Sequence, residues 1–138
     1  MARLLHDFNT EFGEETPGVA ALAERVADFI ERDQAVFLLA GEGPDGIAQM
    51  RYLPSLWTGR LDAYLEELYV VPGLRGAGIG RALLEGAMET ARAAGATRMD
   101  LNTGETDTAA RALYQSTGFT NREGHEDGPS MLYYEREL

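Results

Sequence analysis

Apolar side chains recur at helical spacing over the first part of the chain. Leu4, Leu5 and Phe8 begin a stripe that predicts a short helix over residues 2–12. The same spacing predicts a second helix over residues 18–32, with charged residues along its opposite side. We expect both stripes to pack against a hydrophobic core.

Continuous apolar runs of strand length follow, separated by turn residues. Residues 35–40 and 47–53 flank a Pro-Asp-Gly turn and predict a hairpin. Residues 63–71 predict a central strand, and residues 79–94 have the pattern of a helix. Residues 97–103 alternate apolar with polar side chains, which predicts a strand parallel to the central one because a helical crossover joins the two.

The C-terminal part of the chain predicts one more helix and two more strands. The helix is capped by Asp107 and ends at Gly118, a residue that commonly terminates helices. A short strand begins at Phe119, and the last strand covers residues 131–137. The whole pattern predicts one domain over residues 1–138 of the α/β (α+β) class, with a mixed central sheet, an antiparallel meander, a β-α-β unit and flanking helices.

Composition and charge narrow the functions that the domain can have. The net charge of −11 disfavours binding to DNA or RNA; it is explained either by solubility alone or by an acidic cleft for a cationic substrate. No apolar run approaches the length of a membrane span, and the N-terminus lacks the apolar core of a secretory signal. The absence of cysteine excludes disulfides, Cys-ligated zinc and a cysteine nucleophile, and it fits a cytoplasmic location. The two histidines are isolated, so no metal site is predicted.

A glycine-rich loop joins the central strand to the helix that follows it. A nucleotide-binding P-loop would need Gly-Lys-Ser/Thr here, but Gly80 is followed by Arg81, and a dinucleotide fingerprint would need a third glycine that is missing. The pattern that the loop does satisfy is R-x-x-G-x-G, through Arg75, Gly78 and Gly80. The first amides of the helix would suit phosphate oxygens, although a plain glycine-rich turn is the alternative.

The segment that begins at Asp107 carries a second motif. It fits the pattern Ala-x-x-Leu-Tyr followed by Gly-Phe, through Ala110, Leu113, Tyr114, Gly118 and Phe119. In this order, the two motifs resemble those of the GNAT N-acetyltransferase family. Asp107 stands where the family often has asparagine, a departure that keeps the helix cap. The resemblance is clearest over residues 63–120, and the family's usual first strand is missing or very short, so either a partner strand substitutes or the sheet is one strand smaller.

The resemblance implies that the domain binds acetyl-CoA. The pantetheine arm would lie between the strand that ends at Val71 and the strand over residues 97–103, and the loop amides would hold the pyrophosphate, with added charge from two arginines. The implied cofactor-binding residues are Leu68, Tyr69, Val70, Val71, Arg75, Gly76, Ala77, Gly78, Ile79, Gly80, Arg81, Asn102, Asp107, Ala110 and Tyr114.

The resemblance also implies acyl transfer from a thioester to a primary amine. Glu66 and Glu67 are the candidate bases; regular alternation would send them to opposite faces, and the resemblance favours Glu66, with Glu67 touching the acceptor. A strand amide near Leu68 would stabilise the oxyanion, and Tyr114 would protonate the leaving thiolate. Without cysteine, direct attack in a ternary complex is the expected route.

The acceptor is predicted to be a small cationic amine. Tyr52, Trp57 and Glu67 would bind it, because carboxylates and aromatic faces attract cations. A non-catalytic acyl-CoA sensor and a peptide or protein N-acetyltransferase are the alternatives. Members of the family commonly dimerise, so a homodimer is also expected.

Overall fold

The computed structural model describes residues 1–42 and 44–138. The chain divides into two units, Met1–Leu101 and Asn102–Leu138, which are described separately below as unit 1 and unit 2. Unit 1 contains α1 (Ala2–Glu11), α2 (Val19–Glu31), β1 (Val36–Ala40), β2 (Gly46–Pro54), β3 (Leu61–Val70), the 3-10 turn η1 (Pro72–Leu74), α3 (Ile79–Ala93) and β4 (Ala96–Leu101).

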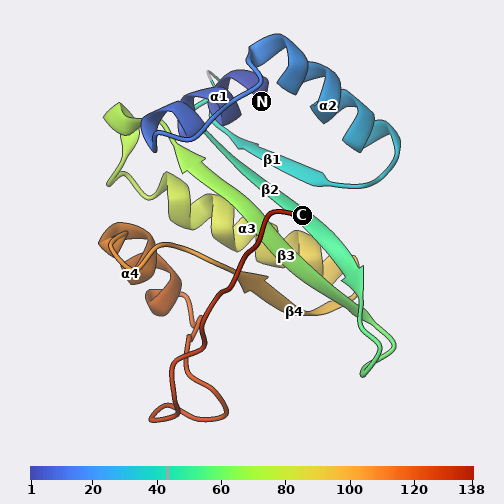
Figure 1. The fold of residues 1–138 in the computed structure, drawn as a ribbon, viewed down its shortest axis with the longest axis vertical. Coiled ribbons are helices and arrows are strands. Elements are labelled where there is room, and N and C mark those ends of the chain that lie inside the picture. Colours follow the sequence, from blue (N-terminus) through green and yellow to red (C-terminus); the bar gives the residue numbers. More distant parts are fainter. Residues whose placement is uncertain (43) are drawn as a thin grey trace. The chain divides into compact units, whose positions relative to one another are not determined.

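The four strands form one mixed sheet in the order β1-β2-β3-β4 (Figure 1). The first three strands form an antiparallel meander, and β4 runs parallel to β3 after the crossover through α3. Each of these helices and strands was predicted by periodicity, with bounds that differ by one or two residues. The predicted fold class, a mixed sheet with a meander and a β-α-β unit, is confirmed.

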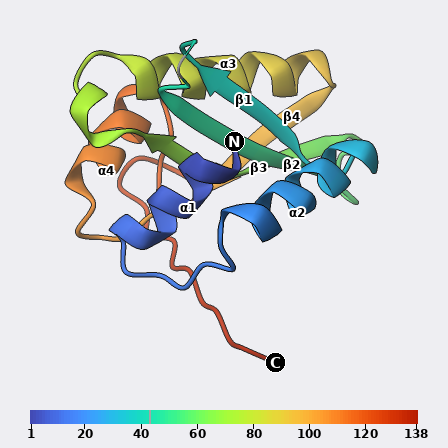
Figure 2. The ribbon, with the colours of Figure 1, turned by 90° about the horizontal axis from the view of Figure 1, so that it is seen from above.

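The helices of unit 1 cover both faces of this sheet. Figure 2 shows α3 on one face and α1 and α2 on the other. Ile47 and Tyr69 are paired across β2 and β3 and pack with Leu4 of α1, which defines the α1 face. On the opposite face, a Cβ added at Gly46 would meet Leu83 of α3 at 3.0 Å. The same Cβ would lie 2.8 Å from the Tyr69 carbonyl oxygen of β3, so the close approach of both β3 and α3 explains why glycine begins β2.

Unit 2 contains α4 (Thr108–Ser116), whose two ends are built as the sequence predicted. The Asp107 side chain accepts a hydrogen bond from the Ala110 amide at 3.0 Å and so caps the first turn. Gly118 has a φ of 93°, and the Phe119 amide donates to the Tyr114 carbonyl at 3.0 Å, which closes the last turn in a Schellman arrangement.

The two strands predicted after Gly118 are wrong. Residues 119–138, all described by the structure, contain only an isolated bridge between Arg122 and Ser130. The side chains of Leu132 and Tyr134 are 71% and 84% exposed. A sequence pattern shows only that a segment is able to form a strand. The strand forms only if another segment pairs with it.

In the described part of the chain, no helix is both long enough and apolar enough to cross a membrane.

Candidate active site

Strand β3 carries a bulge at the two candidate bases. Gln49 pairs with Glu67, and the next residue of β2, Met50, pairs with Leu65. Glu66 is therefore an extra residue that interrupts the alternation of side chains along β3. Because opposite residues share a face, Glu67 lies on the face of Gln49, and Glu66 lies there too because it hydrogen-bonds the same glutamine. The prediction that the two carboxylates point to opposite faces is wrong, since that rule applies to unbulged strands.

Two neighbours on β2 hold the Glu66 carboxylate. The Gln49 amide nitrogen donates to Glu66 Oε2 at 2.5 Å, and the Arg51 guanidinium forms an ion pair with Glu66 Oε1. Gln49 is only 8% exposed, so its amide needs a partner inside the protein. Neither residue was predicted from the sequence; a glutamine within the apolar run of a strand was the signal that could have indicated a polar contact there.

Glu67 has the proton affinity of a base that works near neutral pH. Burial raises the pKa of its carboxyl, and the negative charge of Glu66 raises it further, to about 7. A carboxylic acid with this pKa exchanges protons readily at neutral pH. The structure therefore distinguishes the two glutamates: Glu66 is bound to an arginine, and Glu67 has the shifted pKa.

Beside these carboxylates, the β4 side of β3 has no strand paired with it in the described part of the chain. The pairing of β3 with β4 ends at Leu65 and Leu101, whereas the pairing with β2 continues to Val70. Strand β4 itself ends at Leu101, and Figure 1 shows the arrow of β3 continuing past the tip of β4. An extended ligand with amide groups could pair with an edge of this kind, as an added strand does.

The loop after β3 presents backbone amides around two left-handed glycines. Gly76 and Gly78 have φ values of 81° and 86°, and a Cβ added at either would meet no atom within 4 Å. The first hydrogen bond of α3 runs from the Ala82 amide to the Gly78 carbonyl. Apart from the bonds within helices and strands, no backbone–backbone hydrogen bond of the described residues uses the amides of residues 76–80. This open cluster of N–H groups at a helix N-terminus is suited to the oxygens of a pyrophosphate.

The two arginines of the loop point to different partners. Arg75 donates from Nε to the Val70 carbonyl at 2.9 Å and from its terminal nitrogens to Glu11 at 2.7 and 2.8 Å. Arg81 lies 3.8 Å from Glu85, one turn along α3. The Arg75 side chain is thus directed to the end of α1.

In unit 2, Tyr114 keeps its proton at neutral pH. Burial raises the pKa of its hydroxyl, and the charge of Asp107 adds to this, to about 12. Its ring packs edge-on against Phe119 with 6.0 Å between the ring centres. A neutral phenol can donate a proton or a hydrogen bond, which is compatible with the role predicted for Tyr114.

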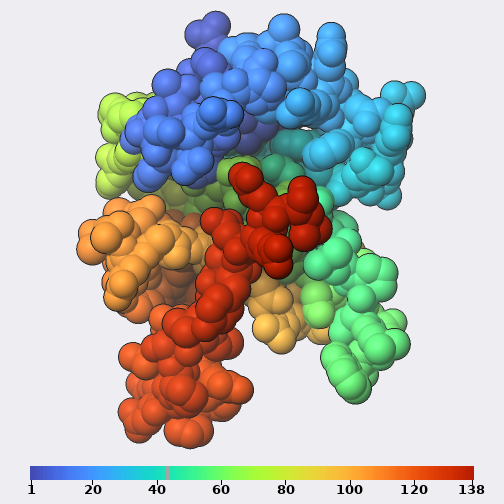
Figure 3. Space-filling view, viewed as in Figure 1, coloured from blue at the N-terminus to red at the C-terminus, as the bar shows by residue number. Residues whose placement is uncertain are grey.

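The aromatic residues predicted to bind the acceptor do not lie beside the carboxylates. The Tyr52 hydroxyl reaches the Thr90 carbonyl of α3 at 3.5 Å, so this side chain lies on the opposite face of the sheet. Trp57 is 93% exposed in the loop between β2 and β3, which projects from unit 1 in Figure 3. Leu61 follows this loop, and the strand from Leu61 to Glu67 spans roughly 20 Å. The structure does not bring either aromatic side chain to the carboxylates, and their assignment as acceptor-binding residues stays a prediction.

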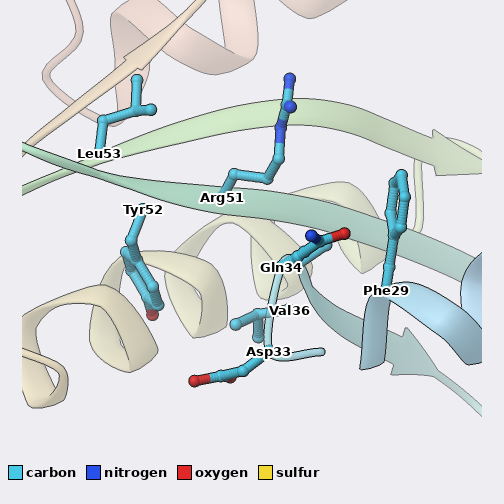
Figure 4. A pocket seen from close by; sticks show the side chains of 8 residues that line it. Phe29, Asp33, Gln34, Val36, Arg51, Tyr52 and Leu53 are labelled. Atoms are coloured by element: carbon cyan, nitrogen blue, oxygen red, sulfur yellow. The ribbon is translucent and has the colours of Figure 1, made fainter. Parts of the chain in front are cut away.

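A cavity that the sequence did not predict opens at the edge of β2, where β1 begins. It has a volume of about 470 Å³ and is lined by Phe29, Asp33, Gln34, Ala35, Val36, Arg51, Tyr52 and Leu53. Figure 4 shows Arg51 and Tyr52 leaving β2 on opposite sides. Arg51 therefore belongs both to the wall of this cavity and to the ion pair with Glu66.

Comparison with known proteins identifies the family of this domain. Residues 1–119 match the model of the acetyltransferase (GNAT) family. An aminoglycoside N(6')-acetyltransferase type 1 of Klebsiella aerogenes is 31% identical over 106 residues, which cover 72% of this chain and 68% of that protein. A mycothiol acetyltransferase of Beutenbergia cavernae is 37% identical over 91 residues, which cover 64% of this chain but 29% of that protein. The chain thus matches less than a third of the length of this second relative.

The fold comparison agrees with the sequence comparison. A crystal structure of a protein from Arthrobacter sp. FB24, described as an acetyltransferase, superposes with a TM-score of 0.90 at 44% identity. The match covers 99% of this chain and 87% of that one.

Proposed function

The chain belongs to the GNAT family of acetyltransferases, and we propose that it transfers the acetyl group of acetyl-CoA to a primary amine of a small cationic molecule. The observation that carries this proposal is the bulge in β3, which places the carboxyls of Glu66 and Glu67 on one face of the sheet beside the open edge of the strand. Burial and the charge of Glu66 raise the pKa of Glu67 to about 7, which suits a general base. This carboxyl is on the strand whose open edge leads to the glycine loop.

The residues of unit 1 fit the parts of acetyl-CoA. The amides of residues 76–80 would bind the pyrophosphate, and the edge of β3 between Leu68 and Val71 would pair with the amides of the pantetheine arm. A Cβ at Gly78 would enter the open space that the phosphates need. When bound, acetyl-CoA supplies a thioester carbonyl that an amine can attack.

Glu67 is the residue that we propose as the base, in place of the expected Glu66. An alkyl ammonium group has a pKa of about 10 and must lose a proton before its nitrogen can attack. The Glu67 carboxylate takes this proton, directly or through a water. The negative charge of Glu66 lies beside Glu67, and Gln49 and Arg51 hold the Glu66 carboxylate in place. This charge favours the protonated form of Glu67 after the transfer.

Two further groups complete the proposed reaction. A backbone amide near Leu68 stabilises the developing oxyanion, and Tyr114 gives its proton to the departing thiolate. The raised pKa of Tyr114 means that its hydroxyl carries that proton at neutral pH. We propose direct transfer in a ternary complex, because the chain has no cysteine to serve as the acyl-carrying nucleophile.

The acceptor class follows from charge. The chain carries a net charge of −11, and Glu66 and Glu67 lie together at the proposed site of attack. A relative named for aminoglycosides supports an acceptor with amines. If the acidity served solubility alone, the charge of the acceptor would not affect its rate.

The test is a steady-state assay of CoA release with acetyl-CoA and a panel of amines. Polyamines and aminoglycosides are expected to react faster than glutamate, with a kcat/KM that falls as salt is added. Binding of acetyl-CoA without turnover on any amine would favour a sensor over an enzyme. Equal rates for cationic and anionic amines would contradict the proposal of a cationic acceptor, but not the proposal of acetyl transfer.

A further inference from the structure

We infer that Arg75 is a positioning residue, which ties the glycine loop to helix α1 through Glu11 and leaves contact with the pyrophosphate to the backbone amides. The inference rests on the proposed role of the loop in binding acetyl-CoA. It replaces the expectation that Arg75 adds its charge directly to the phosphate site.

All three guanidinium nitrogens of Arg75 have partners within unit 1. Nε donates to the Val70 carbonyl at 2.9 Å, while Nη1 and Nη2 donate to the two carboxylate oxygens of Glu11 at 2.7 and 2.8 Å. The paired bonds from one planar group to one carboxylate fix its orientation as well as its position. These bonds use three of the five N–H groups of the guanidinium and hold its plane toward Glu11 and the end of β3.

The partners of Arg75 are themselves held firmly. Glu11 is the last residue of α1, and Phe8, one turn earlier, stacks on the Tyr69 ring at 5.2 Å. Tyr69 is 4% exposed, and the Arg75 guanidinium lies 5.5 Å from the centre of its ring. The Arg75 side chain therefore contacts three ordered parts of unit 1, namely the end of α1, the end of β3 and an aromatic ring of the core.

The ion pair stays charged at neutral pH. Hydrogen bonding from Arg75 lowers the pKa of the Glu11 carboxyl despite the opposing effect of burial, and a hydrogen bond with Tyr69 lowers it further. Both side chains remain partly exposed, at 43% and 31%. A pair with this exposure contributes little to the stability of the whole fold. Its effect is therefore expected at the loop itself.

The backbone of the loop is intrinsically flexible, so contacts that restrain it would matter for binding. It contains Gly76 and Gly78, both at positive φ, and glycine leaves the backbone free to adopt many other conformations. Arg75 stands immediately before this segment, and its own amide donates to the Pro72 carbonyl at 3.3 Å. Fixing the side chain of Arg75 thus fixes the start of the segment whose amides would receive the phosphates.

Charge reversal separates positioning from direct phosphate binding. We would measure the Kd of acetyl-CoA by calorimetry for Glu11→Arg, Arg75→Glu and the double variant that carries both changes. Each single variant is expected to bind at least about tenfold more weakly, and the double variant is expected to recover most of that loss. If Arg75 binds phosphate, the double variant will be as weak as Arg75→Glu, and Glu11→Arg will bind as tightly as the wild type or more so. That result would overturn the inference.

Kinetics provide a second measurement on folded protein. Arg75→Lys keeps the charge but loses the paired bonds, so the KM for acetyl-CoA is expected to rise about threefold to tenfold while kcat at saturation stays near the wild-type value. Glu11→Gln should have the same effect, although it leaves every candidate phosphate ligand in place. An unchanged KM in Glu11→Gln would contradict the inference even if the charge-reversed variants failed to fold.

The control is the ion pair between Asp28 and Arg32 on α2, at 2.7 Å. Its side chains are 44% and 64% exposed, and neither residue contributes to the loop. Asp28→Arg with Arg32→Asp should leave the Kd of acetyl-CoA within about twofold, as for a surface pair. If the wild-type protein itself fails to bind acetyl-CoA, the proposed function falls and this inference falls with it. If the wild type binds and the Glu11 and Arg75 variants bind equally well, only the inference falls.

Discussion

The bulge in β3 and the glycine loop that follows it differ in the kind of charge they present. The bulge carries titratable carboxylates, whereas the loop presents backbone amides that do not titrate. At the bulge, two carboxylates lie together, and burial raises the pKa of Glu67 to about 7. The loop has no acid or base at its centre and offers backbone amides, whose partial charge does not change with pH. The difference suggests a division of labour along one strand and its exit, with proton transfer at the bulge and anion binding at the loop.

This comparison gives each region its own response to pH and mutation. Changes at the bulge should alter turnover and its pH dependence, because they act on a proton. Changes at the loop should alter cofactor affinity with little effect on pH dependence, because amides do not titrate.

Replacing Glu67 by glutamine should have the largest effect. The amide nearly keeps the size of the side chain but cannot accept the ammonium proton, so kcat should fall by about 10²- to 10³-fold, in the range for loss of a general base. The Kd of acetyl-CoA should stay close to the wild-type value. Steady-state kinetics and calorimetry on the same preparation measure both quantities. A wild-type kcat would assign the base to another residue, and Glu66→Gln is the first variant to examine in that event.

The same substitution should stabilise the protein, but only at higher pH. The pKa of the Glu67 carboxyl is about 7 in the folded state against an ordinary value of 4.5, so the folded state binds its proton more tightly. The contribution of the Glu67 carboxyl to the free energy of unfolding is therefore most favourable below pH 4.5, and it is lost as the pH rises toward 7. Glu67→Gln removes this loss, on the order of 2 to 3 kcal/mol above pH 7.

Denaturant unfolding of both proteins at pH 5 and pH 8 measures this effect. The stability difference in favour of the glutamine variant should be clearly larger at pH 8. A difference that is the same at both pH values would mean that the Glu67 carboxyl is not buried with a raised pKa. In that case the main evidence for its role as the base would be lost.

At the loop, Gly78→Val should weaken binding of acetyl-CoA by at least about tenfold, or roughly 1.4 kcal/mol. The valine side chain would enter the open space beside the amides, and a β-branched residue is strained at a φ of 86°. Calorimetric titration measures the Kd, and circular dichroism confirms that the variant is folded. The pH dependence of kcat should match that of the wild type, which distinguishes this variant from those at the bulge. An unchanged Kd would exclude the loop as the phosphate site.

The sequence predicted the helices and strands of unit 1 well because their patterns are local. Stripes such as Leu4, Leu5 and Phe8 need only one face of one helix to be buried. The glycine loop was also predictable, since its motif lies within a few residues of the chain. The C-terminal strand over residues 131–137 was predicted from the same kind of pattern, but a strand also requires a partner, which is not a local property.

The candidate site was harder to predict because its contacts cross the sheet or the chain. The bulge depends on how β3 pairs with β2, and it brings Glu66 to the side chains of Gln49 and Arg51. Arg75 is separated by 64 positions from Glu11, the residue that holds its guanidinium. A motif identifies which residues a site uses, but the direction of each side chain depends on neighbours that the motif does not contain.

The smallest expected effect concerns Arg51, whose positive charge lies at Glu66 and not at Glu67. Arg51→Met would leave the Glu66 carboxylate with its negative charge less compensated, and this charge is one of the two causes of the raised pKa of Glu67. The acidic limb of the kcat/KM profile should therefore move to higher pH by about half a unit to one unit, which is an apparent value for the coupled pair. At pH 6 this lowers kcat/KM by roughly threefold to tenfold, whereas at pH 9 the variant should match the wild type. Arg32→Met, which removes an arginine from the C-terminal end of α2, controls for the change in net charge and should leave the acidic limb in place.

A shift of the acidic limb toward lower pH would contradict this prediction, because it would mean that removing the cation makes Glu67 more acidic. An Arg51→Met profile identical to that of the wild type would show that Glu66 does not act on the base, and the bulge would then hold one functional carboxylate instead of a coupled pair.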